Sequence, residues 1–194
     1  MFRIIKFKLN MKKIAFTLVL AILAVSFISA QTLSVNTTSS MLNWKGTKKV
    51  GEHFGVIAIQ EGVITINDGK IISGEVIINM NDIKVQDTDD IGDQKKIISD
   101  ISSKKFFNTK NYPTSKIIIK SIENGKLVAD LTIKGITKEI SFNTTYSITE
   151  NKLIADSEQF SIDRQNWKLK FGNWLKENML DDPISFTVHI EASL

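Results

Sequence analysis

The residues of this chain that could do acid–base or metal chemistry are few and far apart. The chain contains two histidines, His53 and His189, and no cysteine. His189 falls on the polar face of an alternating run, which is typical of a surface residue. His53 lies in a glycine-bracketed stretch without another histidine or an acid at ligand spacing, so it is only a weak indication of a metal ligand or general base. The lack of thiols excludes thiolate metal centres and cysteine catalysis.

An acidic run at residues 87–93 has the composition of a calcium-binding loop but not its spacing. Ile91 occupies the fifth loop position, where an oxygen ligand is needed, and Ile98 occupies the twelfth, where a bidentate glutamate is needed. Acidic side chains are also favourable at the start of a helix. We therefore expect no metal site here and interpret Asp89, Asp90 and Asp93 as residues near a helix N-terminus.

Catalytic motifs are missing from the sequence. It has no nucleophile motif of the Gly-x-Ser-x-Gly type and no glycine-rich phosphate loop. We accordingly expect a protein that is not an enzyme, with no catalytic residue and no cofactor. The alternative is an enzyme that acts on a small amphiphile. Its working groups would be His53 and Arg164, which would then have to converge at the mouth of a pocket.

The apolar residues are the stronger candidates for function. Alternating runs place Trp44, Phe142, Tyr146 and Phe186 on predicted inward faces. For any one of these residues, a place in a filled core is the simpler interpretation. A closed barrel of about eight strands can instead hold one small ligand. A filled barrel with a large exposed apolar patch, acting as an interaction module, is the third alternative.

The first thirty residues have the layout of a secretory signal peptide. Met11-Lys12-Lys13 is basic, residues 14–28 are almost wholly apolar, and Ser29-Ala30 offers a cleavage site before Gln31. The apolar run is short for a membrane-spanning helix. We predict that residues 1–30 are removed, with Met11 as a candidate for the true start. The mature protein is then periplasmic or secreted, without a stable membrane anchor; a retained N-terminal anchor is the alternative.

The basic character of the whole chain comes from this leader. The formal charge is +4, but residues 1–30 hold five of the 25 basic residues and none of the 21 acidic ones, so residues 31–194 carry −1. Arg164 is the one arginine after residue 30. Without a basic stripe or an arginine cluster, we expect no nucleic-acid partner.

The remaining pattern predicts one all-β domain over residues 31–194. Tight-turn signals such as Asn67-Asp68-Gly69 and Asn124-Gly125 separate alternating runs. Residues 92–103 interrupt the strands with apolar residues at helical spacing, which predicts one short amphipathic helix. Because up-and-down connectivity leaves two exposed sheet edges unless the sheet closes, we expect an antiparallel up-and-down β-barrel of about eight strands.

Several local predictions accompany this architecture. We expect a corner at residues 51–55, a bulge or bend at Gly62, and a turn at residues 135–138. We expect Ile72 to share a face with Gly74, Val76, Ile78 and Met80. Residues 152–163 should form one less regular strand. Residues 172–180, which include Trp174, should form a short helix or an irregular loop.

The stretch of residues 104–142 carries motifs that resemble the YceI-like family. It has Phe106-Phe107, then Tyr112-Pro113-Thr114, then residues 130–138 reading DLTIKGITK. The family typically shows a Phe-Phe-x-x-x-x-Tyr-Pro segment followed by a Gly-x-Leu-Thr-Ile-x-Gly-Val-Thr-Lys strand and turn. The stretches 44–55, 160–171 and 182–192 also resemble family segments. Asp100-Ile101 is a departure, because many members have a His-Leu pair there.

The resemblance implies a lipocalin-like barrel around a long hydrophobic channel. It also implies a polyisoprenoid ligand, such as a quinone or a polyprenyl phosphate, a periplasmic location and a homodimer as a candidate assembly. The family motifs do not fix individual contacts, so the expected lining residues rest mainly on strand parity. The expected ligand-binding residues are Trp44, His53, Phe106, Phe107, Leu131, Ile133, Phe142, Tyr146, Arg164, Trp167 and Phe186.

Overall fold

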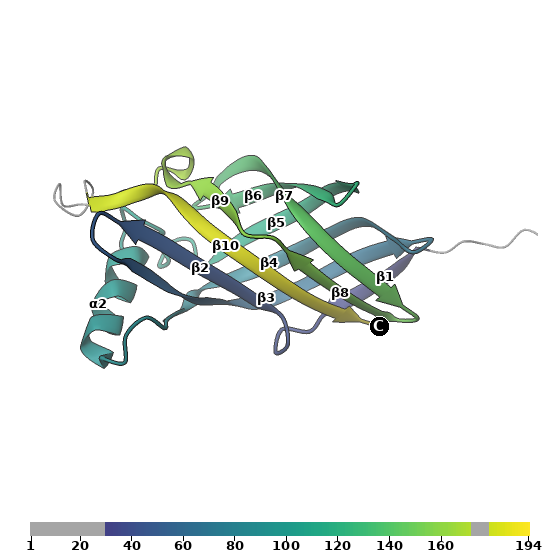
Figure 1. Cartoon of the computed structure of the whole chain (residues 1–194), viewed down its shortest axis with the longest axis horizontal. Coiled ribbons are helices and arrows are strands. Elements are labelled where there is room, and N and C mark those ends of the chain that lie inside the picture. Colours follow the sequence, from purple (N-terminus) through teal and green to yellow (C-terminus); the bar gives the residue numbers. More distant parts are fainter. Residues whose placement is uncertain (1–29, 172–178) are drawn as a thin grey trace, which may run out of the picture.

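A computed structural model describes residues 30–171 and 179–194 of the chain. The strands are β1 (Gln31–Val35), β2 (Met41–Lys48), β3 (Glu52–Asn67), β4 (Lys70–Val85), β5 (Thr114–Glu123), β6 (Lys126–Ile133), β7 (Ile136–Thr149), β8 (Lys152–Ser157), β9 (Phe160–Asp163) and β10 (Leu180–Ser193). The described helices are α2 (Ile91–Ser102) and the short 3-10 helix η1 (Arg164–Trp167). Figure 1 shows an elongated barrel with α2 at one end.

The sheet closes into a ring of eight strands in which neighbours run antiparallel. The order is β10, β2, β3, β4, β5, β6, β7, β8, and β8 pairs with β10 again. Each of the two remaining strands continues the wall where a strand of the ring ends. Strand β1 pairs with β3 and β10 beyond the end of β2, and β9 pairs with β10 beyond the end of β8. The predicted up-and-down barrel of about eight strands with one helix is therefore confirmed.

Sequence alternation and short turns explain most of the wall. In β6, Leu127, Ala129, Leu131 and Ile133 are all buried and the residues between them are more exposed. Two-residue turns join neighbouring strands at Asp68-Gly69, Asn124-Gly125 and Lys134-Gly135, and all six residues have positive φ. This is the turn geometry that matches the right-handed twist of paired strands.

The structure corrects several local predictions. His53 lies within β3, opposite Gly46, so the predicted corner at residues 51–55 is limited to the turn before Glu52. The turn predicted at residues 135–138 is Lys134-Gly135, because Ile136 already pairs with Ile133. The predicted single strand at residues 152–163 is two strands, β8 and β9.

Two predictions for β3 and β4 fail because the register changes along this strand pair. Ile72 is exposed, and Ile71 is buried in its place, because a register shift lies between Thr65 and Ile66. Gly62 pairs regularly with Val76, and the shifts lie elsewhere in β3. A Cβ on Gly62 would lie 2.8 Å from Val35 Cγ2, so this glycine instead allows β1 to pack closely.

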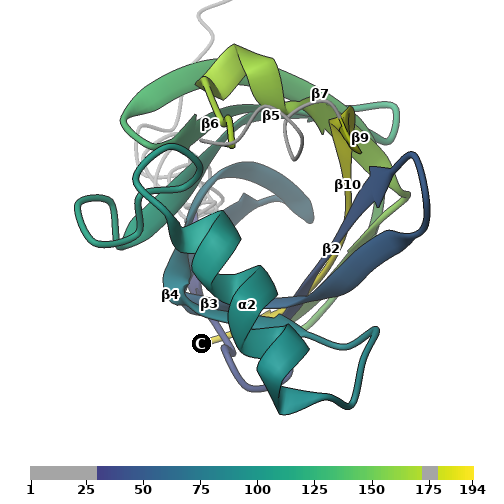
Figure 2. The same cartoon turned by 90° about the vertical axis from the view of Figure 1, so that its left-hand side faces the viewer.

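The helix α2 lies across one end of the barrel, as the view along the barrel shows (Figure 2). Asp90 caps it, accepting a hydrogen bond from the Asp93 backbone N–H at 2.9 Å, so the predicted role of this acidic run near the helix start is confirmed. Three half-buried isoleucines form the stripe that packs against the barrel core: Ile97, Ile98 and Ile101.

The segment after α2 fixes the helix to the barrel. Phe106 and Phe107 are buried in the core. Lys134 Nζ donates to the carbonyl of Lys105 at 2.9 Å, and the Lys170 backbone N–H donates to the same carbonyl at 3.1 Å. Desolvation by burial holds the pKa of Lys134 below its usual value. These contacts join the helical excursion, the β6–β7 turn and the segment after η1.

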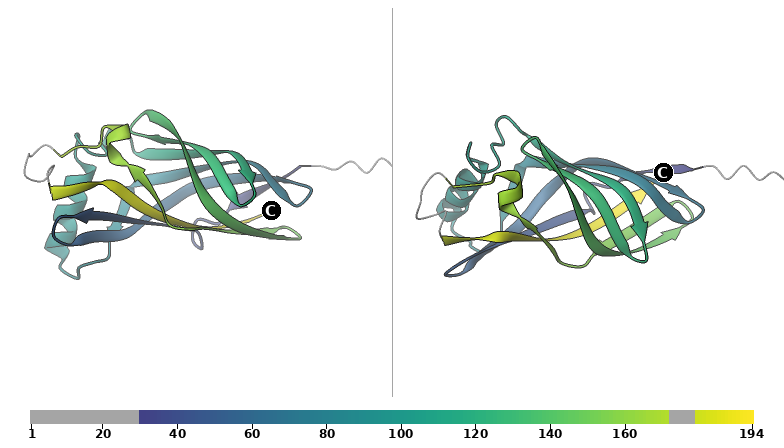
Figure 3. Two further views of the ribbon diagram at one scale, coloured as in Figure 1. Left: turned by 45° about the horizontal axis from the view of Figure 1, so that its top comes forward. Right: turned by 90° about the horizontal axis from the view of Figure 1, so that it is seen from above.

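The interior divides into a helix end and a hairpin end, which two further views show at opposite ends of the long axis (Figure 3). We call the end near α2 the helix end; its core cluster includes Trp44, Phe106, Phe107 and Trp167. The hairpin end holds the β3–β4 and β7–β8 turns, and its core cluster includes Leu33, Ile64, Ile66, Ile71 and Leu153. Of residues 172–180, Met179 and Leu180 alone are described, and of the predicted leader Ala30 alone.

Candidate functional site

A large cavity opens at the helix end of the barrel. Its volume is about 510 Å³, and its walls come from β2, β3, β4, β10, α2 and the segments that follow β4 and α2. Most of the lining is apolar. A cavity of this size is within the range of small-molecule sites, which are typically apolar with a few polar groups. We call it the helix-end cavity.

Aromatic side chains form one wall of the helix-end cavity. Phe106 stacks on Phe171, with ring centroids 4.8 Å apart, and meets Phe107 edge to face at 4.9 Å. Trp44 lies on the barrel wall and donates its ring N–H to the Lys84 carbonyl at 3.2 Å. The four rings therefore present carbon surface to the cavity, while the polar atom of Trp44 is already bonded.

A second cavity, which we call the interior cavity, lies deeper in the barrel. Its volume is about 120 Å³. Its lining is apolar apart from the hydroxyl-bearing residues Ser115, Thr144 and Ser157. The Thr144 hydroxyl already donates to the Asp156 carbonyl at 2.9 Å. A space without charged groups and with few polar atoms suits a hydrocarbon chain.

The two cavities meet at a shared set of side chains. Ile57, Phe107 and Phe186 line both of them. Both cavities lie on the inner side of the same strands, so these three residues form the boundary between the helix-end cavity and the interior cavity. The two cavities therefore adjoin, one at the mouth beside α2 and the other inside the barrel.

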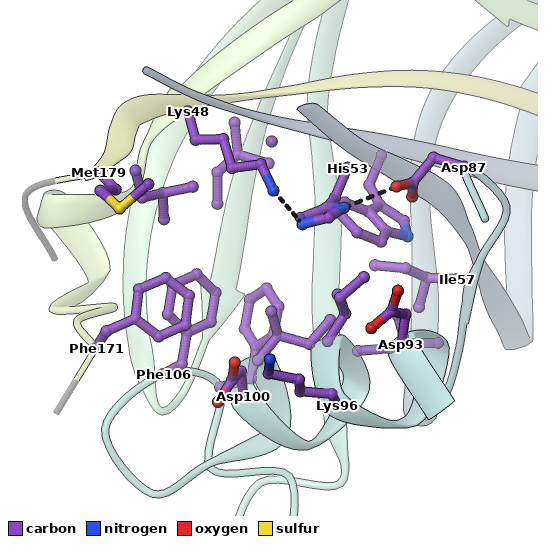
Figure 4. A pocket seen from close by; sticks show the side chains of 18 of the residues that line it. Lys48, His53, Ile57, Asp87, Asp93, Lys96, Asp100, Phe106, Phe171 and Met179 are labelled. Atoms are coloured by element: carbon purple, nitrogen blue, oxygen red, sulfur yellow. Dashed lines mark hydrogen bonds and ion pairs between the residues drawn. The ribbon is translucent and has the colours of Figure 1, made fainter. Parts of the chain in front are cut away.

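One wall of the mouth carries a chain of hydrogen bonds through His53. Its Nδ1 lies 2.7 Å from Asp87 Oδ2, and its Nε2 lies 2.7 Å from Lys48 Nζ (Figure 4). The other Asp87 oxygen accepts the Phe54 backbone N–H at 3.1 Å. A carboxylate can only accept, so Nδ1 carries the ring proton and Nε2 is free to accept from Lys48.

Asp87 is held as a carboxylate by this arrangement. Desolvation by burial would raise its pKa, but the hydrogen bond from His53 and the backbone hydrogen bond from Phe54 outweigh it, so the pKa lies below the usual 3.8. An ionised Asp87 in turn keeps the Nδ1–H tautomer of His53. Lys48, His53 and Asp87 thus form one ordered polar chain on the cavity wall.

Helix α2 contributes the charged groups on the opposite side of the mouth. Asp93, Lys96 and Asp100 line the cavity from α2, across from the Lys48–His53–Asp87 chain (Figure 4). The departure from the family motif at Asp100-Ile101 therefore falls within the cavity lining. The mouth is polar on two sides and aromatic on another.

The predicted ligand-binding residues divide into three sets. Those that line the helix-end cavity are Trp44, His53, Phe106, Phe107 and Phe186, and those that line the interior cavity are Phe107, Leu131, Ile133, Phe142 and Phe186. Tyr146, Arg164 and Trp167 line neither. Sequence reasoning missed Lys48, Asp87 and the charged face of α2.

Arg164 is buried and bonded to the backbone around η1. Its NH1 donates to the Leu169 carbonyl at 2.7 Å, its Nε donates to the Asp181 carbonyl at 3.3 Å, and NH2 lies 3.0 Å from Asp182 Oδ1. The ring N–H of the neighbouring Trp167 donates to the Leu131 carbonyl at 3.3 Å. These contacts fix the loop around η1, so both side chains have a structural role there.

The second histidine lies on the outer wall. His189 Nδ1 is 2.7 Å from Asp156 Oδ1, and this hydrogen bond, opposed by desolvation, raises the pKa of His189. Neither residue lines a cavity.

Within residues 30–171 and 179–194, no three histidine, aspartate or glutamate side chains are grouped to hold a metal ion. In the same residues, no helix has the length and apolar character needed to cross a membrane.

The sequence matches the family model of the YceI-like domain over residues 33–192. Among curated proteins, a UPF0312 protein of Staphylococcus aureus strain MSSA476 is 30% identical over 104 residues, which is 48% of this chain and 60% of the relative. A second one, from strain USA300, is 29% identical with the same coverage. The match thus spans about three fifths of the length of these curated relatives.

Solved structures with low sequence identity share the fold. BcnA of Burkholderia cenocepacia superposes with a TM-score of 0.63 at 18% identity, covering 82% of this chain and 99% of BcnA. A polyisoprenoid-binding domain from Saccharophagus degradans, implicated in plant cell wall breakdown, gives 0.61 at 13% identity, with 83% and 97% covered. A Campylobacter jejuni YceI protein gives 0.50 at 16% identity, with 100% and 91% covered.

Proposed function

The chain belongs to the YceI-like domain family, and from this premise we propose that it binds a long-chain isoprenoid lipid inside its barrel. The observation that carries the proposal is the pair of adjoining, mainly apolar cavities, the helix-end cavity and the interior cavity. Ile57, Phe107 and Phe186 line both of them. The polyisoprenoid-binding domain of Saccharophagus degradans, which has the same fold, supports this ligand class.

The orientation of the ligand follows from where the polar groups lie. Every charged lining side chain belongs to the helix-end cavity, and the interior cavity has hydroxyl groups alone. Burying an unpaired polar head in the interior would cost several kcal/mol, roughly 2–7. The isoprenoid tail therefore enters the interior cavity, while the head group, a quinone or a polyprenyl phosphate, stays near α2.

In this proposal the protein carries or stores the lipid and is not an enzyme. Removal of residues 1–30 would place it in the periplasm or outside the cell without a membrane anchor. The alternative enzyme needed His53 and Arg164 together at a pocket mouth. His53 lies there, whereas Arg164 is buried among backbone carbonyls and lines neither cavity. An interaction module with a filled barrel does not fit the 510 Å³ cavity.

Native mass spectrometry of the protein purified from its own host, followed by lipid extraction, tests the proposal. We expect a bound isoprenoid lipid. A matched pair of variants links the lipid to the interior: Ala155 lines the interior cavity, whereas Ala58, on β3, lines neither cavity. Ala155→Phe should reduce lipid uptake and Ala58→Phe should not. Protein that stays lipid-free after incubation with prenyl chains or quinones would contradict the proposal.

A further inference from the structure

We propose that the helix-end cavity selects an uncharged quinone head group and disfavours a phosphorylated one, with Lys48 as the hydrogen-bond donor to the quinone carbonyl. This inference rests on the proposed function and decides between the two head groups that it leaves open. The charges that line the mouth and the fixed position of Lys48 carry the inference.

The first observation is the charge of the lining. Two lysines, Lys48 and Lys96, face three carboxylates, so the described lining side chains carry a formal charge of −1 with a neutral His53. The three carboxylates belong to Asp87, Asp93 and Asp100.

A negative lining repels a phosphate. A phosphate monoester carries a charge of about −1.5 to −2 near neutral pH. Sites for such groups typically use bidentate arginine, lysine as a point charge, or an open helix N-terminus. Here Arg164 lines neither cavity, and the start of α2 is already capped by the Asp90 carboxylate with Asp93 in the first turn. Among the described residues, the mouth therefore offers a phosphate Lys48 and Lys96 alone, and three carboxylates outnumber them.

The second observation is that Lys48 is a positioned donor. One of its N–H groups donates to His53 Nε2 at 2.7 Å, and His53 is itself fixed by Asp87. An ammonium group has three N–H groups, so two are left for a ligand oxygen. The described residues offer no other hydrogen-bond partner for the Lys48 ammonium group. A quinone carbonyl can accept from this ammonium without adding a negative charge to the cavity.

The third observation is the shape of the apolar wall. Phe106 and Phe171 stack with an interplanar angle of 23°, and Trp44 lines the same cavity. Planar aromatic surfaces pack well against a planar quinone ring. A flat, uncharged head group with an acceptor oxygen therefore matches three features of the mouth. These are the Lys48 donor, the negative charge of the lining and the aromatic surface.

Competition between ligands with one common tail tests the inference. The protein is purified from cells that express the full-length chain, stripped of lipid, and offered a naphthoquinone with a geranylgeranyl tail, geranylgeranyl monophosphate and geranylgeraniol. Native mass spectrometry measures the relative affinities. We expect the quinone to bind at least about tenfold more tightly than the monophosphate, because like charges in a binding site cost several kcal/mol.

Charge variants locate the source of this preference. Asp93→Asn/Asp100→Asn changes the lining charge from −1 to +1, and we expect it to raise monophosphate affinity by about tenfold while quinone affinity stays within about twofold. The matched control is Asp68→Asn/Asp89→Asn, which makes the same change of charge at residues that line neither cavity. An equal effect of both pairs would show a general charge effect and overturn the local one.

Lysine variants test the donor. We expect Lys48→Met to weaken quinone binding about tenfold, which is the usual size for loss of a charge-assisted hydrogen bond, and to leave geranylgeraniol binding unchanged. Lys49→Met is the control, since Lys49 is exposed and outside the lining. If Lys48→Met weakens all three ligands equally, its side chain acts through packing and the inference is wrong.

His53 and Asp87 are positioning residues in this scheme. We expect His53→Gln, which keeps an acceptor for Lys48, to retain more quinone affinity than His53→Leu, with equal geranylgeraniol affinity in the two variants. Equal quinone affinity in both variants would contradict a positioning role. Monophosphate binding as tight as quinone binding would overturn the head-group inference and leave the proposed function standing. Binding of none of the three ligands would overturn both.

Discussion

The two ends of the barrel interior differ in packing. At the hairpin end, Leu33 and Leu153 have no exposed surface, and isoleucines of β3 and β4 surround them. At the helix end, the side chains leave a cavity of about 510 Å³, against about 120 Å³ in the interior cavity. Tight packing stabilises a fold, while an unfilled cavity forgoes contacts. The hairpin end is therefore packed more closely, and the helix end holds the larger of the two cavities.

The two cavities also differ in the polar groups that line them. The lining of the interior cavity has hydroxyls and no charge, whereas the mouth has five charged side chains and His53. Charged groups are tolerated at the mouth because α2 covers the opening only in part and leaves Lys96 and Asp93 exposed. The difference sets a direction along the barrel, from a polar head site to an apolar tail site.

The largest expected effect is the loss of packing at the hairpin end. Leu153→Ala should lower the free energy of unfolding by about 3 kcal/mol, because it removes a fully buried side chain and leaves a cavity. At the helix end, Ile97→Ala should cost only about 1 kcal/mol, because Ile97 is half-buried whereas Leu153 is fully buried. Denaturant unfolding followed by tryptophan fluorescence measures both. Equal costs would mean that the two ends are packed alike.

The next effect concerns Arg164, which lies outside both cavities. Arg164→Met should lower the free energy of unfolding by about 2 kcal/mol, because buried backbone carbonyls lose their donor. Asp182→Asn is the control; its carboxylate is half exposed, so we expect a cost below about 1 kcal/mol. Lipid affinity of folded Arg164→Met should match that of the original protein. A selective loss of affinity would instead place Arg164 in the binding site.

A smaller effect is expected from Asp87, at the mouth. Its pKa is lower when folded than the usual 3.8, so the ionised form contributes stability above that value, and the contribution is lost as the pH falls through the folded pKa. Asp87→Asn should therefore be less stable than the original protein at pH 7, by about 1 kcal/mol, with the gap closing below about pH 4. Unfolding curves from pH 7 to pH 2.5 would show this. A gap that persists at the lowest pH would contradict it.

The smallest effect has the opposite pH dependence and comes from the outer wall. The pKa of His189 is raised by Asp156, so its contribution is full below the usual 6.5 and is lost as the pH rises through the folded pKa. His189→Gln should cost a few tenths of a kcal/mol, about 0.5, at pH 6 and less at pH 9, since the pair is partly exposed. If His189→Gln lowers the free energy of unfolding more at high pH than at low pH, the expected pH dependence is wrong.

Sequence patterns predicted the barrel well because its wall follows local rules. The turn at Asp68-Gly69 and the alternation in β6 depend on neighbouring residues alone. The same holds for the Asp90 cap of α2. Each of these features is encoded within a few residues, so no distant contact was needed to predict it.

The polar chain at the mouth could not be predicted in the same way. Next to the β3–β4 turn, Asn67 pairs with Lys70. If this register continued along the whole strand pair, His53 would lie opposite Lys84. Register shifts along β3 and β4 instead pair Gly55 with Val85, which brings Asp87 opposite His53. These bulges depend on packing across the whole strand pair. In the sequence, His53 therefore has no visible partner, although the fold pairs it with Asp87.

The alternation of residues along the strands could not predict the cavity either. Parity correctly placed Trp44, Phe142 and Phe186 inside, but it cannot tell a filled interior from an open one. The aromatic wall depends on how Phe106, Phe107 and Phe171 are brought together by the segments after α2 and η1. The size of the opening is set by these long-range contacts.

A structure of the protein bound to the geranylgeranyl naphthoquinone would test the account most directly. We predict that the quinone ring lies beside Lys48 and the Phe106–Phe171 stack, and that the tail passes Ile57, Phe107 and Phe186 into the interior cavity. A ligand on the outer wall, or an interior closed by rearranged side chains with the ligand left at the mouth, would contradict the account.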